Sequence, residues 1–465
     1  MISRRTLIAG TASGVAVAAT GAGFIFSSAA KDLRSALLYA YGLYEFAHRM
    51  QILSLQIQRP GTVKKTDILA QYPTWKGEPI LNRQLHRLRQ VTHEAREITT
   101  PNNDTLYTSA VLSLGDGPVE VTVPDVETRY LSVAFMDAFS DQIAYIGTRA
   151  TQGKGGRFWV YGPGQTAATP EGVTAIQSTT NDLWMLARVF VAGSEDLPAA
   201  QEVQQAITAQ PVDPRNTGTP FTVTAPERPD PGTFLALTNE LLSRSPLQGE
   251  ALRARDFAHL GIDPGNRDAF AQLPRLKREL WSRGIEGVEQ RIMAHTLEQQ
   301  ETTNGWTMPP AVLGRYGIHD DVRSAVAVVG FGALTLEEAA YFKGLTDSSG
   351  ASLDGRKKYR MVIPASGIPA KAFWSLSMYA VDADNRQYFY RNALNRYAIN
   401  SHSEDLLRQV DGSIVLALQS DRPADPSVVW MPTPDSIFNC VFRTYLPGEP
   451  IVEGQWTPPP LVQVS

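Results

Sequence analysis

Short runs rich in β-branched and aromatic residues fill one stretch in the first half of the chain. They span residues 105–114, 118–123, 129–137, 157–161 and 184–192. Glycine- and proline-rich segments, such as Gly162-Pro163-Gly164, separate each run from the next. Short, evenly spaced strands with this punctuation are typical of a β-sandwich or barrel, and not of βαβ units.

The same pattern of β-branched and aromatic runs occurs near the C-terminus. Strand-like runs occupy residues 359–364, 373–381, 413–419, 428–431 and 438–445, and a proline-rich tail follows at 456–460. We therefore expect a second β domain.

Helical spacing of apolar residues marks the remaining segments. Helices are predicted over residues 31–58, 82–96, 194–209 and 324–345, and a helical pattern extends over 233–300. Between 211 and 231 the density of proline, which fixes φ and removes a backbone donor, argues against regular structure.

These patterns predict a mainly β fold with helical segments (α+β). It consists of two β-sandwich or jelly-roll-like domains joined by a helical and proline-rich section. The expected boundaries are a helical region at 31–100, a first β domain at 101–195, a connecting region at 196–344 and a second β domain at 345–465.

The first thirty residues have the composition of an export signal. Arg4 and Arg5 precede an apolar run from Leu7 to Phe26, and small residues follow at 27–30. This order is typical of a secretory signal, and the arginine pair indicates the twin-arginine translocase as the partner in export. An uncleaved anchor is the alternative, since about twenty apolar residues are enough to span a bilayer. The glycines in the run favour cleavage, which predicts a periplasmic or secreted protein with no stable membrane span.

Charge and cysteine content exclude several classes of protein. Without Arg4 and Arg5, 41 basic and 47 acidic residues leave a net charge of −6, which gives no footprint for nucleic acid. The single cysteine, Cys440, excludes an internal disulfide and a multi-cysteine metal site. The strand pattern predicts that it is a small buried side chain.

Two polar clusters in the first β domain are candidates for a site. The segment Asn102-Asn103-Asp104 leads through Thr105 and Leu106 to Tyr107, and fits either a structured loop or a ligand site. Asp137 and Asp141 lie between two strands, with Arg149 after the second. These charges suit either a structural ion pair or a polar cup whose carboxylates do acid–base work.

A third cluster is aromatic and lies in the second β domain. Trp374, Tyr379, Tyr397 and Trp430, with Arg396, would suit stacking against sugar rings if exposed, and core packing if buried.

The chain resembles two domain-of-unknown-function families, 1254 and 1214, which occur in tandem in bacterial exported proteins. In the first half the resemblance is carried by residues 102–107, Arg129-Tyr130, Asp137, Gly147-x-Arg149, Gly162-Pro163-Gly164 and Arg188. In the second half it is carried by 373–379, Asn395-Arg396-Tyr397, Asp411-Gly412-Ser413, Arg443-x-Tyr445-x-Pro447 and Gly454-x-Trp456-x-x-Pro459. Val429 stands where the family usually has asparagine before Trp430. The resemblance implies two β-sandwich domains with a helical section between them, and by fold analogy alone a likeness to glycan amidases.

Three functions remain open. The first is a hydrolase of a carbohydrate or glycoconjugate, in which Asp104, Asp137 or Asp141 supply acid and base. Its substrate would be bound by Asn102, Asn103, Tyr107, Arg149 and Arg188. The second is a non-catalytic binding protein for a small molecule or glycan, with a cleft between the sandwiches lined by the aromatic cluster. The third is a cofactor-dependent enzyme. The cofactor is unknown, and no metal site is predicted, because only His86 and His93 share a predicted helix face.

Overall fold

The computed structural model describes residues 28–58, 64–96, 99–166, 168–299, 301–383 and 386–464. The predicted export signal lies outside these residues, except for 28–30, which begin the first helix. In the described part of the chain, no helix combines the length and apolar character needed to cross a bilayer.

Two sheets pack face to face in the first sandwich. One has the order β1 (Gln84–Arg87), β2 (Thr105–Ser113), β8 (Asp182–Phe190), β4 (Leu131–Asp137) and β5 (Gln142–Gly147). The other has the order β7 (Val173–Gln177), β6 (Gly156–Tyr161), β3 (Val119–Val123) and β9 (Thr208–Pro211). Alternate residues of β2, such as Leu106 and Leu112, point into the shared core, and Tyr107 points to the outer face.

The second sandwich is built in the same way. Its larger sheet has the order β10 (Thr302–Thr303), β11 (Trp306–Thr307), β12 (Ala339–Gly344), β19 (Phe438–Pro447), β14 (Ala370–Val381) and β15 (Gln387–Tyr388), and β16 (Ala398–Asn400) also pairs with β14. Its smaller sheet has the order β18 (Val429–Pro432), β17 (Ile414–Gln419), β13 (Lys358–Ile363) and β20 (Val462–Val464). Cys440 lies in the core between these sheets, where burial raises the pKa of its thiol.

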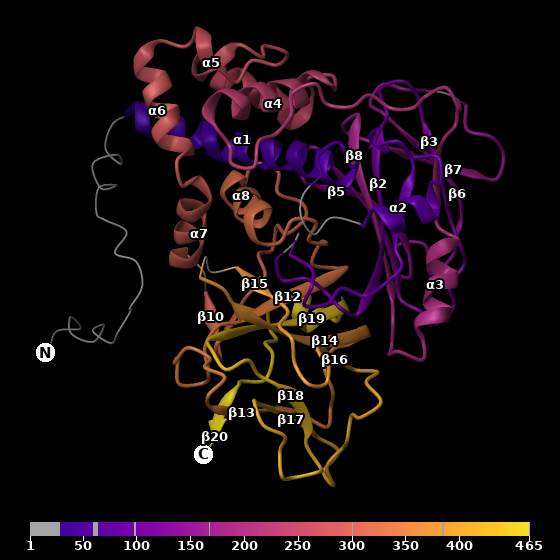
Figure 1. Cartoon of the computed structure of the whole chain (residues 1–465), viewed down its shortest axis with the longest axis vertical. Coiled ribbons are helices and arrows are strands. Elements are labelled where there is room, and N and C mark those ends of the chain that lie inside the picture. Colours follow the sequence, from indigo (N-terminus) through magenta and orange to yellow (C-terminus); the bar gives the residue numbers. More distant parts are fainter. Residues whose placement is uncertain are drawn as a thin grey trace, which may run out of the picture.

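Helices cover part of the outer face of the larger sheet of the first sandwich, where Met136 and Trp184 pack in the same core as α1. The buried helix α1 (Ser28–Leu53) lies among α4 (Pro231–Ser243), η2 (Gly249–Leu260), α5 (Ala269–Gln272), α6 (Arg275–Ile285), α7 (Val288–Gln299) and α8 (Asp320–Val329) (Figure 1). The Asp230 side chain caps α4 by accepting from the Thr233 amide at 3.0 Å, and Pro231 occupies the first turn. The short helices α2 (Lys65–Gln71), α3 (Leu197–Gln205) and α9 (Glu449–Val452) lie outside this layer.

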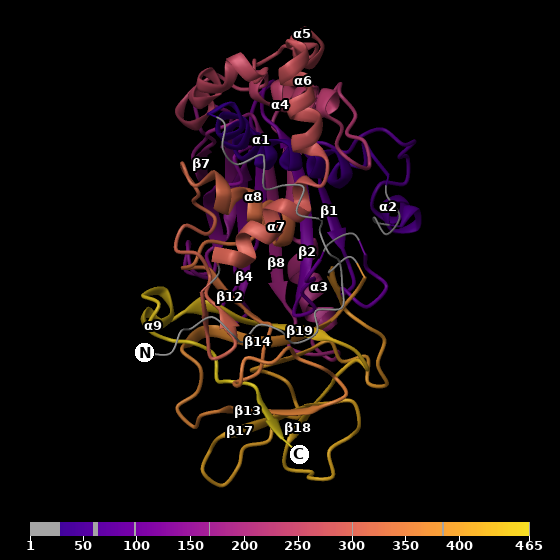
Figure 2. The same ribbon diagram turned by 90° about the vertical axis from the view of Figure 1, so that its left-hand side faces the viewer.

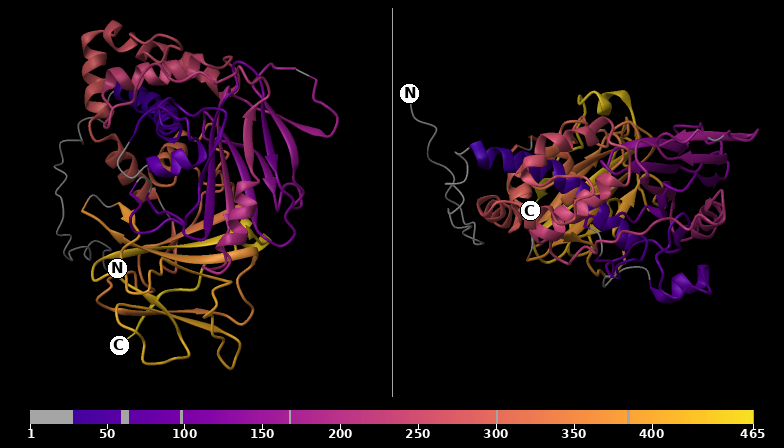
Figure 3. Two further views of the ribbon diagram at one scale, coloured as in Figure 1. Left: turned by 45° about the vertical axis from the view of Figure 1, so that its right-hand side comes forward. Right: turned by 90° about the horizontal axis from the view of Figure 1, so that it is seen from above.

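The outer faces of the two larger sheets meet. Figure 2 shows β2, β8 and β4 running from the helical layer down to the sheet of β12, β19 and β14. Figure 3 shows the helices at one end of the molecule and the second sandwich at the other. Phe190 and Tyr130 of the first sandwich pack against Phe373 and Tyr445 of the second. The predicted fold class, mainly β with helical segments, is confirmed.

Two predicted helices were wrong in part. Residues 82–96 contain the edge strand β1, which pairs with β2, so His86 and His93 share no helix face. The helix predicted over 324–345 ends at Val329, and Ala339–Gly344 form β12 instead. Short apolar runs fit either period, and pairing with a neighbouring strand overrides local propensity.

The expected connecting region contains two strands, β9 and β12, that belong to the sheets of the two sandwiches. Both lie within residues 196–344, which we expected to be helical and proline-rich. β9 pairs with β3 of the first sandwich, and β12 pairs with β19 of the second.

Candidate functional site

The loop of residues 100–104 joins the two sandwiches. Asn102 donates from Nδ2 to the Tyr445 hydroxyl at 2.6 Å. The buried Asp104 carboxylate accepts from Ser375 Oγ at 2.5 Å and from Asn400 Nδ2 at 3.1 Å. Burial raises the pKa of Asp104, and these two donors oppose the rise. Asp104 therefore binds the second sandwich, and among the described residues no hydrogen bond links it to Asp137 or Asp141.

Backbone carbonyls of the same loop bind the second sandwich too. Arg443 donates from Nη2 to the carbonyl of Thr100 at 2.9 Å and from Nη1 to Ser377 Oγ at 2.8 Å. The Tyr379 hydroxyl donates to the carbonyl of Pro101 at 2.6 Å. Most of the polar groups in this loop are thus bonded inside the protein.

Asn103 and Arg149 also have partners. Asn103 donates from Nδ2 to the carbonyl of Val91 at 2.6 Å. Arg149 forms an ion pair with Glu338, from Nε to Oε2 at 2.5 Å, and the Tyr130 hydroxyl donates to the other oxygen of Glu338 at 2.9 Å. Arg149 is therefore held by a carboxylate of the segment entering β12.

Asp137 and Asp141 lie at the opposite end of the sheet from Asp104. Both β2 and β4 run antiparallel to β8, so the start of β2 and the end of β4 are far apart. Asp137 accepts from the amides of Phe139 and Asp141 at 2.9 and 3.0 Å, and from Thr179 Oγ1 at 2.5 Å. The polar cup expected from Asp137, Asp141 and Arg149 is not formed, because Arg149 follows β5 beside the start of β4, at the other end of the β4–β5 pair.

Asp137 and Asp141 instead face a third carboxyl group. Burial and the charge of Asp141 raise the pKa of Asp137 to about 6. Burial also raises the pKa of Glu250 to about 7, against the lowering effect of Arg323, and Glu250 hydrogen-bonds to Asp141. Carboxyl groups whose pKa is raised by burial and by neighbouring carboxylates, as for Asp137 and Glu250, are able to act as acids near neutral pH.

Arg188 is a buried cation with one unpaired guanidinium nitrogen. Its side chain is 7% exposed, and Nη2 donates to the Gly332 carbonyl at 2.8 Å. Nη1 has no hydrogen-bond partner, and no carboxylate of the described residues forms an ion pair with it. Its guanidinium lies over the ring of Tyr107 at 5.8 Å. An unpaired buried donor of this kind requires an explanation.

Gly332, whose carbonyl accepts from Arg188, lies against the ring of Trp184. Its φ is +82°, and a Cβ there would lie 2.5 Å from Cζ3 of Trp184. Only glycine fits this position without strain.

Two side chains of β12 face the same region. Tyr341 and Lys343 are half-buried, and both lie on the outer face of the sheet, since Ala340 and Phe342 point into the core. Burial and the charge of Arg443 lower the pKa of Lys343 to about 8. Among the described residues, neither the Lys343 amine nor the Tyr107 hydroxyl has a hydrogen-bond partner.

We call this group of side chains the arginine–tyrosine site. It consists of Tyr107, Arg188, Tyr341, Lys343 and Arg443. Tyr341 is within electrostatic range of Arg188, Arg443 and Tyr107, and Lys343 is within range of Arg443. The site thus combines three cations with tyrosine hydroxyls, and part of its hydrogen-bonding capacity is unused.

Most of the predicted aromatic cluster lies elsewhere. Trp374 is in the core of the second sandwich, stacked on Phe442 at 5.6 Å. Trp430 is on β18 of the smaller sheet and donates to the Gln419 carbonyl at 2.9 Å. The alternating strand pattern places these two tryptophans away from the face that meets the first sandwich.

The remaining members have structural partners. Tyr397 is buried beside Tyr379, with its hydroxyl 2.6 Å from Nδ1 of His93. Arg396 donates to the Trp430 carbonyl at 2.7 Å and to Asp405 at 2.5 Å. Of the expected cleft residues, Tyr379 lies beside the arginine–tyrosine site through its contact with Arg443.

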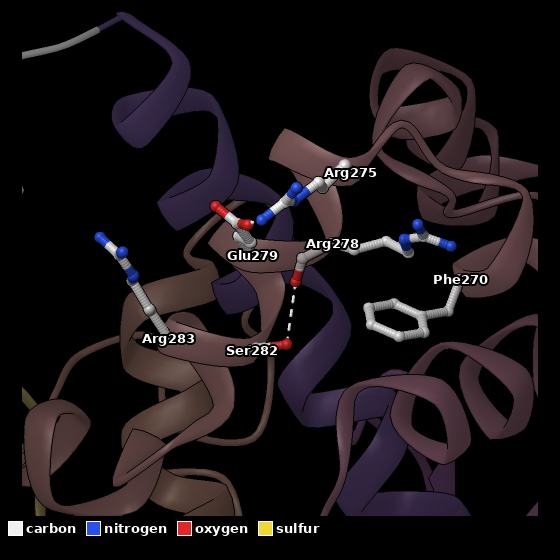
Figure 4. A pocket seen from close by; sticks show the side chains of 6 residues that line it. All are labelled: Phe270, Arg275, Arg278, Glu279, Ser282 and Arg283. Atoms are coloured by element: carbon white, nitrogen blue, oxygen red, sulfur yellow. Dashed lines mark hydrogen bonds and ion pairs between the residues drawn. The ribbon is translucent and has the colours of Figure 1, made fainter.

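Two surface pockets lie away from this site. One, of about 430 Å³, is at α5 and α6 in the helical layer (Figure 4) and is lined by Phe270, Arg275, Arg278, Glu279, Ser282 and Arg283. Another, of about 290 Å³, includes Trp430 and Tyr390. Within the described ranges, no three His, Cys, Asp or Glu side chains are grouped to hold a metal ion.

Sequence reasoning missed Tyr341, Lys343 and Glu250. The alternation of small or polar residues with Ala340 and Phe342 was the signal for the first two, and it was read as helix. Glu250 carried no local signal, because only the packing of η2 brings it to Asp141.

Comparisons with known proteins identify two family models. DUF1254, a protein family of unknown function, matches residues 81–211, and DUF1214, also of unknown function, matches residues 338–449. No curated protein matches the chain. The crystal structure of the VPA0106 protein from Vibrio parahaemolyticus is similar, with a TM-score of 0.67, 20% identity and coverage of 94% of this chain and 100% of that one. An uncharacterised protein from Burkholderia cenocepacia gives a TM-score of 0.45 at 13% identity, with 94% and 89% covered.

The role of Asp104 in joining the sandwiches gives a stability prediction. Asp104→Ala leaves the Ser375 hydroxyl and the Asn400 amide without their acceptor, which we expect to lower the free energy of unfolding by about 3 kcal/mol. Urea unfolding followed by circular dichroism measures this loss. An equal stability of variant and wild type would contradict the assignment.

The raised pKa of Asp137 gives a pH prediction. Folding favours its protonated form, so this contribution is complete below pH 4 and is lost as the pH rises through about 6. Asp137→Asn stays neutral, so its stability relative to wild type should rise by about 1.4 kcal/mol between pH 5 and pH 7.5, with a corresponding rise in its relative Tm. A difference in Tm that does not change with pH would show that Asp137 titrates normally.

Proposed function

The chain belongs to the proteins that carry DUF1254 and DUF1214 in tandem, and from this premise we propose that it binds an anionic ligand at the arginine–tyrosine site. The unpaired, buried guanidinium nitrogen of Arg188 carries this proposal. Leaving such a donor unsatisfied costs about 1–3 kcal/mol, more for a charged group, which an anion in contact with Nη1 would offset.

Two further groups support the same ligand class. The Tyr107 hydroxyl and the Lys343 amine retain accessible surface, and both are able to donate hydrogen bonds. The carboxylate nearest to Arg443, Asp104, already accepts from Ser375 and Asn400. An excess of cations over available carboxylates favours an anion.

The position of the site fits a binding function of the tandem. Tyr107 and Arg188 lie in the segment matched by DUF1254, and Tyr341, Lys343 and Arg443 lie in the segment matched by DUF1214. A ligand here requires both halves. This resembles the binding-protein alternative of the sequence analysis, with tyrosines and cations in place of the tryptophan cleft.

Hydrolysis of a carbohydrate or glycoconjugate remains a second candidate. The hydrogen bond between Glu250 and Asp141, with Asp137 nearby, favours acid–base chemistry. Glycosidases, however, hold their two carboxyl groups at least about 5 Å apart, and a direct hydrogen bond requires a shorter separation.

We also propose export by the twin-arginine route, on the composition of residues 1–30.

Thermal unfolding of the full chain tests anion binding. The probes are lactate, glutarate, glycerol phosphate and laurate, each compared with chloride at equal ionic strength. A bound anion raises Tm in a saturable way, because it binds only the folded state. We expect at least one probe to raise the Tm of wild type, and Arg188→Gln to weaken its binding about tenfold or more. The exposed Arg215→Ala is the control.

Two tyrosine variants separate binding from stability. Tyr107→Phe removes a hydroxyl without a partner, so Tm should stay the same while the response to the anion falls. Tyr379→Phe removes a hydroxyl bonded to Pro101 and Arg443, so Tm should fall while the response stays. If no probe distinguishes Arg188→Gln from Arg215→Ala, the proposed site is wrong.

A further inference from the structure

We propose that Lys343 forms a covalent imine with ligands that carry an aldehyde or ketone next to their anionic group, such as 2-keto acids. This inference rests on the proposed anion site and names its ligand class. It concerns the amine of Lys343, which a purely electrostatic site would use only as a charge.

The placement of Lys343 is the first argument. In the register of β12 and β19, Tyr341 lies opposite Arg443 and Lys343 opposite Val441. Tyr341 and Lys343 are two residues apart on one strand, so their side chains leave the same face. A carboxylate held by Arg443 or Arg188 would therefore place an adjacent carbonyl on the face that carries the amine.

The freedom of the amine is the second argument. Lys343 is half-buried and has no carboxylate partner among the described residues. Partial desolvation of a lysine without a counter-ion is costly, and such groups cluster at functional sites. With its pKa lowered to about 8, roughly a tenth of the amine is neutral at pH 7, on the order of a hundred times more than for a lysine in water.

The reaction needs no oxidant or reductant. The neutral amine attacks the carbonyl carbon, so that a C–N bond forms and the C=O π bond breaks, and one proton leaves the nitrogen as the oxygen gains one, which gives a neutral carbinolamine. Loss of that hydroxyl with a proton, as water, leaves the imine. The Tyr341 hydroxyl, on the same face, is the group best placed to supply the proton to the departing oxygen.

Reductive trapping tests the inference on the full chain. The protein is incubated with pyruvate and sodium cyanoborohydride, and the adduct is located by intact mass and peptide mapping. We expect one reduced pyruvate adduct at Lys343, formed at least tenfold faster than at the exposed Lys357 and half-maximal near pH 8. Acetone, which lacks the carboxylate, should label Lys343 at least tenfold more slowly than pyruvate.

Variants at the same position separate amine from charge. Lys343→Arg keeps the cation, so it should retain the Tm increase given by lactate or another anion but lose the adduct. Lys343→Met should lose both, and removal of an unpaired amine should not lower its own Tm.

The outcomes distinguish the two proposals. An anion response that depends on Arg188, with no faster labelling of Lys343 than of Lys357, overturns the imine and leaves the anion site standing. No anion response in wild type overturns the proposed function. Preferential pyruvate labelling that persists in Arg188→Gln would show a reactive lysine independent of the anion site, and would contradict the ligand class proposed here.

Discussion

The contact between the two sandwiches depends on one buried carboxylate. Asp104 is 2% exposed and receives its two side-chain donors, Ser375 and Asn400, from the second sandwich. A buried carboxylate is costly unless it accepts hydrogen bonds. Asp104 obtains its side-chain donors only when the second sandwich packs against the first. Asn102 and the carbonyls of Thr100 and Pro101 extend the same contact.

This contact places two incomplete faces opposite each other. The outer face of β2 and β8 carries Tyr107 and Arg188, and the outer face of β12 and β19 carries Tyr341, Lys343 and Arg443. In an isolated sandwich, each of these faces would expose its cations and aromatic rings to solvent. Where the two faces meet, some side chains form hydrogen bonds across the interface, and others have donors without a partner.

The distribution of satisfied and unsatisfied groups separates structural from functional candidates. Asp104, Asn102 and Arg149 looked like site residues in the sequence, yet each is consumed by an inter-sandwich bond. Arg188 and Tyr107 have lost most of their solvent without gaining full hydrogen bonding. Burial without compensation is therefore the more informative signal here than polarity in a loop.

The sequence alone determined the fold class, most of the strands and the family resemblance. Runs of β-branched and aromatic residues bounded by glycine and proline are local signals, so β2, β4, β14 and β19 were predicted without a structure. It could not separate helix from strand at Ala339–Gly344, where a short apolar run fits both. The tertiary structure alone decided which polar residues meet, because strand direction sends Asp104 and Asp137 to opposite ends of one sheet and packing brings Glu250 to Asp141. Proximity across the chain is set by pairing and packing between distant segments, and no local pattern encodes it.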